Sequence, residues 1–211
     1  MVERPTSKAA KPTLQAEDLS ICFVNTVAWR LREPNEERLG SPSALLEWLG
    51  RNGLAQPHDL RLLRGAWTAQ PGEAAKAYEM AIQLRESIYT LFIACIARSR
   101  PPSSALAFLT RVLWHQPSGL RLEWERDRMS WHLGRTNLDP LDLLRPIALS
   151  AADLVTGSRT HKIRQCQDDR GCGWLFVDES RVQNRRWCSM GDCGNRAKAR
   201  RHRERIRAVR E

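Results

Sequence analysis

The stretch that decides the fold of the C-terminal part is residues 166–193. It begins Cys166-Gln-Asp-Asp-Arg-Gly-Cys172 and ends Cys188-Ser-Met-Gly-Asp-Cys193. Two close cysteine pairs separated by 15 residues are typical of a four-thiolate zinc site. The segment between the pairs, residues 174–186, is long enough for a hairpin that returns the second pair to the metal. The sequence therefore predicts one structural Zn²⁺ held by Cys166, Cys172, Cys188 and Cys193.

Disulfides or a redox-active dithiol are the alternative for these thiols. The N-terminus lacks the apolar stretch of a signal peptide, so we expect a cytoplasmic protein whose thiols stay reduced. His161 and His202 are the nearest substitute ligands, but four thiolates already fill a tetrahedral shell and leave no open position for catalysis. Cys22 and Cys95 fall on apolar helix faces, where we expect them to pack in the core.

Positive charge is concentrated near the C-terminus. The chain of 211 residues has a net charge of +10, and residues 161–211 contribute +7 of it through 14 basic and 7 acidic residues. This asymmetry favours a C-terminal module that faces nucleic acid, with a solubilising tail as the alternative.

The segment after the last cysteine, residues 194–210, reads as a basic helix that begins at the metal. It has eight basic residues and one acidic residue, without proline. Phosphates would relieve its self-repulsion, so DNA or RNA backbone contact is the functional interpretation. A solvated face, or an electrostatic partner for the zinc tetrathiolate, remains open.

Residues 15–160 read as a mostly helical domain, preceded by a disordered tail over residues 1–14. Alternating apolar and polar residues predict a β-hairpin from 120–124 and 129–133. Periodicity and capping residues predict helices over 19–29, 42–51, 57–68, 72–98, 104–113 and 140–156. We expect this domain and the zinc-binding part to have separate cores.

Composition and motifs exclude several classes of function. Apolar residues make up 42% of the chain and charged residues 27%, as in an ordinary globular protein. No window approaches 18 consecutive apolar residues, so we expect no membrane span. The chain also lacks a Ser-His-Asp arrangement, a phosphate loop or a defensible carboxylate pair, so we expect no enzyme.

Six tryptophans fall in the helical part, and core and rim packing is their simplest role. The alternative is a ligand pocket lined by several of them, with polar groups such as Asn25, Arg30 or His132. The six are Trp29, Trp48, Trp67, Trp114, Trp124 and Trp131.

Three segments carry a resemblance to a known family. Residues 172–181 (CGWLFVDESR), 185–190 (RRWCSM) and 193–201 (CGNRAKARR) closely resemble the CGNR zinc finger, a bacterial treble-clef-like finger thought to bind DNA. Upstream, residues 21–27 (ICFVNTV) and 45–54 (LLEWLGRNGL) look like the ABATE domain that usually precedes that finger. The first cysteine pair here is separated by five residues where four are expected, which implies a slightly larger loop.

The resemblance implies an α+β, mostly α protein: a helical sensing or assembly domain over residues 15–160 and a treble-clef-like finger with a basic helix over 161–211. It implies a stress-linked transcription regulator that binds DNA and one Zn²⁺, with a small-molecule signal, a protein partner or a second copy at the N-terminal domain. Asp178 would support the zinc site, and Arg196 would either support it or contact DNA. Asn195 would cap local backbone, with base reading as the alternative. Candidate nucleic-acid contacts are Arg181, Arg185, Arg186, Arg196, Lys198, Arg200, Arg201, Arg203 and Arg205.

Two alternatives of other classes stay open. A protein-interaction adaptor would use the basic finger to dock on an acidic protein surface. An RNA-binding protein would stack bases on aromatic side chains, but the finger's aromatics are few and we expect them to pack.

Overall fold

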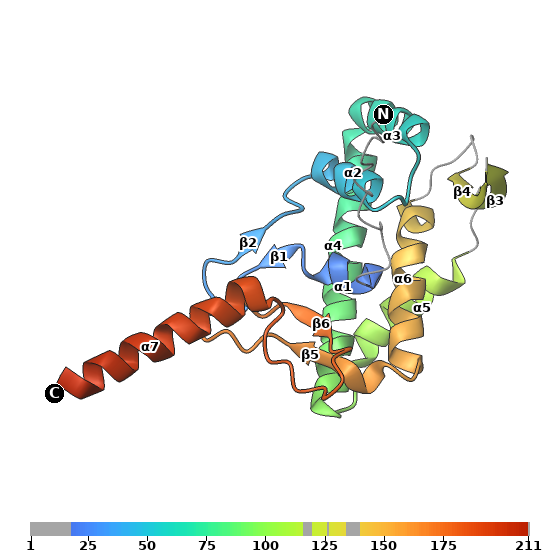
Figure 1. Ribbon diagram of the computed structural model, residues 1–211. Helices are drawn as coiled ribbons and strands as arrows, with labels where there is room; N and C mark the ends of the chain where they lie inside the picture. Colours follow the sequence, from blue (N-terminus) through green and yellow to red (C-terminus); the bar gives the residue numbers. More distant parts are fainter. Residues whose placement is uncertain (1–17, 116–119, 126, 134–139, 211) are drawn as a thin grey trace, which may run out of the picture.

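The longest helix, α4 (Pro71–Ala97), runs through the middle of the molecule, and the other helices of the N-terminal part surround it (Figure 1). The computed structural model describes residues 18–115, 120–125, 127–133 and 140–210. The predicted tail over residues 1–14 lies outside these ranges. The described helices are α1 (Leu19–Val24), α2 (Pro42–Arg51), α3 (Pro57–Ala69), α4, α5 (Ser103–Trp114), α6 (Pro140–Thr156) and α7 (Asn195–Arg210).

The described strands form three small antiparallel sheets of two strands each. This confirms an α+β protein that is mostly helical. The strand pairs are β1 (Val27–Ala28) with β2 (Glu36–Glu37), β3 (Leu120–Glu125) with β4 (Arg128–Leu133), and β5 (Ile163–Gln165) with β6 (Leu175–Val177).

Local signals placed most helix ends correctly. The Ser41 hydroxyl accepts a hydrogen bond from the Ala44 N–H at 3.1 Å, and Pro42 occupies the first position of α2. At the other end of the domain, α6 begins at Pro140 and ends at Thr156, as predicted.

The first helix is shorter than predicted. It was expected to reach Trp29, but α1 ends at Val24, because Val27 and Ala28 pair with the β2 strand instead. Trp29 then adopts a φ of 56°, which no right-handed helix allows. The pairing of β1 with β2 therefore determines the structure after Val24. The apolar pattern of residues 19–29 is too short to distinguish a helix from a strand.

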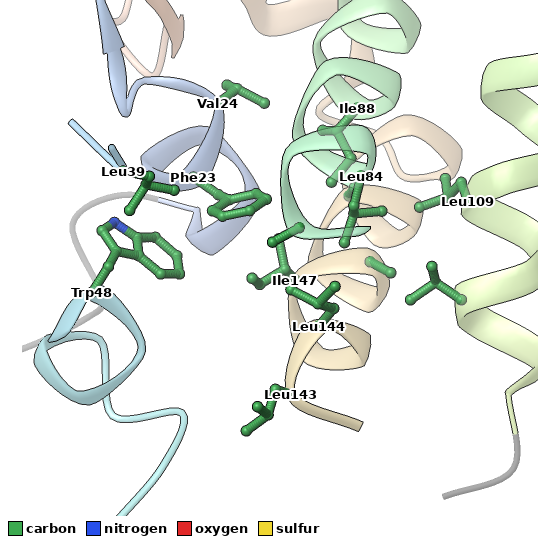
Figure 2. Close-up of a cluster of buried hydrophobic side chains, with 14 of the residues drawn as sticks. Phe23, Val24, Leu39, Trp48, Leu84, Ile88, Leu109, Leu143, Leu144 and Ile147 are labelled. Carbon is green, nitrogen blue, oxygen red and sulfur yellow. The ribbon is translucent and has the colours of Figure 1, made fainter. Parts of the chain in front are cut away.

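The main core lies between α4 and the helices around it. Figure 2 shows Phe23 of α1 against Trp48 of α2, with ring centroids 5.0 Å apart. On the other side of the cluster, Leu84 and Ile88 of α4 face Ile147 and Leu144 of α6 (Figure 2). These side chains are almost fully buried, so hydrophobic burial holds the helices in place.

The core of the N-terminal part continues into the finger. Ile163 of β5 and Leu175 of β6 are each 1% exposed and belong to the same buried cluster as the helices. We expected two separate cores, and the structure corrects this in part. The β5–β6 hairpin shares the main core, whereas Cys166, Cys172 and Cys193 form a second buried cluster with Trp174 and Trp187 packed on it. The finger is too small to bury enough apolar surface alone, so its hairpin packs on the larger body.

Among the described helices, α4 has the length and composition to cross a membrane, with 27 residues and a mean hydropathy of 1.3. This qualifies the expectation that no such segment exists. However, α1, α2, α3, α5 and α6 all pack against it. It also carries Arg85, which is buried and ion-paired to Glu37 and Glu86. We therefore describe α4 as a core helix.

Packing accounts for some of the tryptophans only. Trp48 is buried and Trp67 packs on the main core. Trp114 and Trp124 are instead 81% and 67% exposed, so the expectation of packing is wrong for them. Trp114 is the last residue of α5, and Trp124 lies in the β3–β4 hairpin. The side chain of Trp131 lies outside the described part of the structure.

Candidate metal centre and nucleic-acid interface

The four predicted cysteines meet at one point, brought there by a hairpin and a helix. Cys166 follows β5 and Cys172 precedes β6, so the first pair lies in the turn of the β5–β6 hairpin. Cys188 and Cys193 come from the turn that leads into α7. We expected the hairpin within residues 174–186, and this was wrong. Strand β6 pairs backward with β5, and the chain after it returns without regular strands.

The sulfur geometry fits zinc. The four Sγ atoms lie within 4.8 Å of one another, and the Cys172–Cys188 and Cys188–Cys193 sulfur distances are both 3.7 Å. A tetrahedron with Zn–S bonds of about 2.3 Å has edges of about 3.8 Å. All four donors are soft thiolates with no open position, which suits one structural Zn²⁺ that orders the finger and leaves no room for a reactive ligand.

The ionisation of the four cysteine thiols also favours a bound cation between them. Hydrogen bonds from Cys172 and Cys188 lower the pKa of the Cys166 thiol to about 2. The neighbouring Cys166 and Cys172 sulfurs raise the pKa of Cys188 in return. Four thiols at this spacing cannot all ionise unaided, whereas bound Zn²⁺ stabilises all four thiolates together.

Glycines let the zinc loop (residues 166–172) lie directly on the N-terminal part. Gly171 has a φ of +87°, and a Cβ built there would lie 2.9 Å from Arg32 Cβ and 3.0 Å from the Leu31 backbone. The Leu31 N–H donates to the Gly171 carbonyl at 3.0 Å, and the Arg30 N–H donates to the Cys172 carbonyl at 3.1 Å. The segment 29–32, called the junction segment below, is therefore paired to the loop that holds two zinc ligands.

The carboxylate of Asp178 holds the segment that follows β6, residues 178–187, by hydrogen bonds. Asp178 is fully buried, and its carboxylate accepts hydrogen bonds from the Ser180 hydroxyl at 2.5 Å and the Arg185 N–H at 2.8 Å. Burial alone would raise its pKa, but these hydrogen bonds hold the pKa of the Asp178 carboxyl below its ordinary value. The expected supporting role for Asp178 agrees with this geometry.

Arg196 lies at the centre of the finger's polar contacts. Its guanidinium donates to Asp168 at 2.9 Å, to Asp192 and to the Cys193 sulfur at 2.8 Å. It also lies over the Trp29 ring, 5.3 Å from the centroid. Each contact ties the first turn of α7 to a zinc ligand, to its flanking residues or to the junction segment, so Arg196 acts in positioning.

The other candidate contacts divide into held and exposed side chains. Arg185 donates to the backbone carbonyls of Trp187 and Cys188 and lies 4.7 Å from the Phe176 centroid, so it is held by the finger. Arg186 donates to Gln167, and Arg200 pairs with Asp169 and Glu204. The exposed side chains are Arg181, Arg186, Lys198, Arg201, Arg203 and Arg205, and of these Arg186 and Arg201 also lie over the Trp187 ring.

Helix α7 projects away from the body (Figure 1). Its first two turns are anchored: Ala197 is 6% exposed, Asn195 donates to the Gly191 carbonyl at 3.1 Å, as expected of a local cap, and Arg200 pairs with Asp169. Residues 201–208 are all exposed. The helix N-terminus, with its partial positive charge, points at the tetrathiolate, which favours this attachment.

A cleft of about 980 Å³ opens between α1, α2 and the finger, and Trp29, Trp48 and Trp174 are among its lining residues. Of the polar groups expected in such a pocket, Asn25 lines it but bonds to Leu175. Arg30 instead pairs with Glu86 at 2.6 Å, and the side chain of His132 lies outside the described part.

Sequence reasoning missed the residues that join the two parts. The Trp174 indole N–H donates to the Val27 carbonyl at 2.9 Å, and Gln165 donates to the Tyr89 hydroxyl at 2.8 Å. Arg30 lies over the same Tyr89 ring, 4.0 Å from its centroid. The two hydrogen bonds span 147 and 76 residues of sequence, so no local pattern signals them.

Comparison with known families agrees with this architecture. The family model of the ABATE domain, described as "putative stress-induced transcription regulator", matches residues 17–158. The CGNR zinc finger model matches residues 162–206. No curated protein matches the chain. The chain belongs to the ABATE family and carries a CGNR zinc finger at its C-terminal end. Neither of these is a family of enzymes.

Proposed function

We propose that the protein is a cytoplasmic DNA-binding transcription regulator that catalyses no reaction. In this proposal residues 161–211 bind DNA, and residues 15–160 receive a signal or a partner. The observation that carries it is the exposed basic surface of α7, which is attached rigidly at the zinc end. The family descriptions support a regulator but name no ligand.

The shape and charge of α7 suit a nucleic acid. Its 16 residues span about 24 Å, enough to reach across a groove of duplex DNA. Lys198, Arg201 and Arg205 are three or four residues apart and so share one face of the helix. Arg203 adds charge on the opposite side of the helix, while Arg181 extends the basic surface onto the finger. Zinc would hold the helix at a fixed angle to the body, so that these charges meet phosphates without ordering a loop.

The test is the salt dependence of DNA binding. If about five side chains meet phosphates, log K should fall with log salt with a slope of about −4.5. Arg201→Ala with Arg205→Ala should weaken binding to all duplex sequences and flatten the slope by about two. Fluorescence anisotropy with a labelled duplex at several salt concentrations measures both quantities.

A matched control is available on α3, at the far end of the body from α7 (Figure 1). Arg61 and Arg64 are exposed, and replacing both with Ala removes the same charge without touching the finger. This variant should keep the wild-type slope. Equal losses in both double variants, or none in either, would contradict a specific role for α7.

The two alternatives give different results in the same assay. An adaptor for an acidic protein surface would show no salt-dependent binding to duplex DNA. An RNA-binding protein would prefer single-stranded RNA to a DNA duplex at equal salt. We favour DNA because the three aromatic rings of the described finger are already engaged. Phe176 is buried, Trp174 bonds to the Val27 carbonyl and lies against Arg38, and Trp187 lies against arginines.

We place the signal site in the cleft between α1, α2 and the finger. Its size suits a small molecule, and its walls combine tryptophans with arginines, including Arg38 and Arg51. Native mass spectrometry of the purified protein should then detect a bound molecule that Arg51→Glu removes. Arg64→Glu on α3 is the control, and loss of the molecule there as well would point to a non-specific ligand.

A further inference from the structure

The β3–β4 hairpin separates its residues sharply between two faces. Directly paired residues in an antiparallel sheet share a face, and successive residues alternate between faces. The register therefore places one set on an apolar face and the other on a polar face. The apolar positions are Leu120, Leu122 and Trp124, paired with Leu133, Trp131 and Met129; the polar positions are Arg121, Glu123 and Glu125, paired with His132, Ser130 and Arg128.

Among the described residues, the exposed apolar side chains of this hairpin have little to pack against. Leu122, Trp124 and Met129 are 51%, 67% and 50% exposed. Within the described residues, β3 and β4 pair only with each other and make at most sparse contacts with the helices. An isolated two-stranded sheet is marginally stable in water, and exposed Trp and Met side chains are typical of interfaces. An additional strand paired to this hairpin would therefore stabilise it.

We propose that a second copy of this chain supplies it, through antiparallel pairing of the two β3 edges into one four-stranded sheet. The sequence of β3 is complementary to itself when the two-fold axis passes through Leu122. That register sets Leu122 opposite its own copy, Arg121 opposite Glu123 and Leu120 opposite Trp124. Both charged pairs are attractive and all the apolar pairs lie on one face, which is the arrangement that stabilises cross-strand neighbours.

The competing arrangements are less favourable. Pairing about Glu123 would also form two attractive pairs, Arg121 with Glu125, but it would set two Glu123 side chains directly opposite each other, and like charges in that position destabilise a sheet. Pairing through the β4 edge offers Arg128, Ser130 and His132 on its polar face, with no acidic residue to complement them. Charge therefore selects the β3 edge and the register about Leu122. The result is a closed two-fold dimer, in which the same patch serves both copies.

This dimer does not depend on the proposed DNA binding, and its test uses the zinc-loaded full chain without DNA. Sedimentation velocity should give twice the mass of one chain. Arg121→Glu and Glu123→Arg should each weaken the dimer by at least about tenfold, because two attractive pairs become repulsive. An equimolar mixture of these two variants should recover it, and so should the double variant Arg121→Glu/Glu123→Arg.

Two further variants make the register decisive. Arg128→Gln, on the β4 strand, and Glu125→Gln, beyond the paired part of β3, create no like-charge pair within the hairpin and should leave the dimer unchanged. Dissociation by Glu125→Gln would overturn the register about Leu122. Circular dichroism should show that all variants keep their helices, since the hairpin lies outside the core.

Other results would overturn the proposal itself. A wild-type chain that stays monomeric at every concentration would do so. So would a dimer that Trp124→Ser dissociates but neither charge reversal affects, because that pattern means that apolar faces stack. A change of mass only when another protein is added would assign the hairpin to a different partner.

Discussion

The side-chain amide of Asn25 bonds to both backbone groups of Leu175. Its Nδ2 donates to the Leu175 carbonyl at 2.8 Å, and its Oδ1 accepts from the Leu175 N–H at 2.9 Å. Asn25 follows α1, whereas Leu175 lies in β6 of the finger, 150 residues later. A side chain thus completes the edge of β6 in place of a third strand, and the backbone of the finger is satisfied by the N-terminal part.

Asn25→Ala should destabilise the whole chain. It leaves the N–H and carbonyl of the buried Leu175 without partners, which costs about 1–3 kcal/mol. Chemical denaturation followed by circular dichroism measures the loss. Asn52→Ala is the control, because it removes one hydrogen bond to Trp48 within the same helix end and should cost about 0.5 kcal/mol. Equal effects of the two variants would mean that the Asn25 contact does not join the two parts.

Zinc removal should affect the N-terminal part as well as the finger. The junction segment pairs with the zinc loop, and Ile163 and Leu175 share the main core. Chelation, or Cys188→Ser, should therefore raise amide hydrogen exchange at residues 27–32 as well as at 163–177. Elemental analysis should give one Zn²⁺ per wild-type chain. Exchange at residues 27–32 that stays unchanged after chelation would show that the two parts are independent.

Gly171→Ala should be costly where Gly65→Ala is beneficial. Gly171 combines a φ of +87° with a Cβ position only 2.9 Å from Arg32 and 3.0 Å from Leu31, so any Cβ must displace the junction segment. We expect a loss of more than about 1 kcal/mol, with weaker zinc retention. Gly65 lies within α3 with nothing near its Cβ position, so alanine there should add about 0.5–1 kcal/mol. Thermal unfolding should show a lower melting temperature for Gly171→Ala and a higher one for Gly65→Ala.

Acid stability should depend on Glu86. Burial would raise its pKa, but hydrogen bonds from Arg30 and Arg85 hold the pKa of the Glu86 carboxyl below its ordinary value of 4.5. A carboxyl whose pKa is lowered by folding stabilises the fold above its unfolded pKa and loses that contribution as the pH falls through the folded pKa. Glu86→Gln should thus be less stable than wild type at neutral pH.

The difference between wild type and Glu86→Gln should shrink as the pH falls below about 4.5. Acid release of zinc affects both chains alike and cancels in the comparison. Denaturant midpoints measured across this pH range provide the check. A difference that stays constant with pH would show that the charge on Glu86 contributes nothing.

Much of the local structure was predictable from short stretches of the chain. The zinc ligands were predictable because metal geometry restricts cysteine spacing, and the start of α2 because Ser41 and Pro42 act within one turn. The β3–β4 hairpin was predictable because apolar and polar residues alternate over two adjacent runs, which matches the two-residue period of a strand. In each case the residues that determine the structure are close together in the sequence.

The tertiary structure alone decided how these pieces combine. The shared core and the position of the finger on the body depend on contacts between residues more than 100 positions apart, such as Asn25 with Leu175. It also decided that Arg185 and Arg196, which look like phosphate contacts in the sequence, are held by carbonyls and carboxylates of the finger. The sequence shows the sign of each charged side chain but not which group it will contact. Folding determines this, because it brings together groups that are distant in the sequence, such as Arg196 and Asp168.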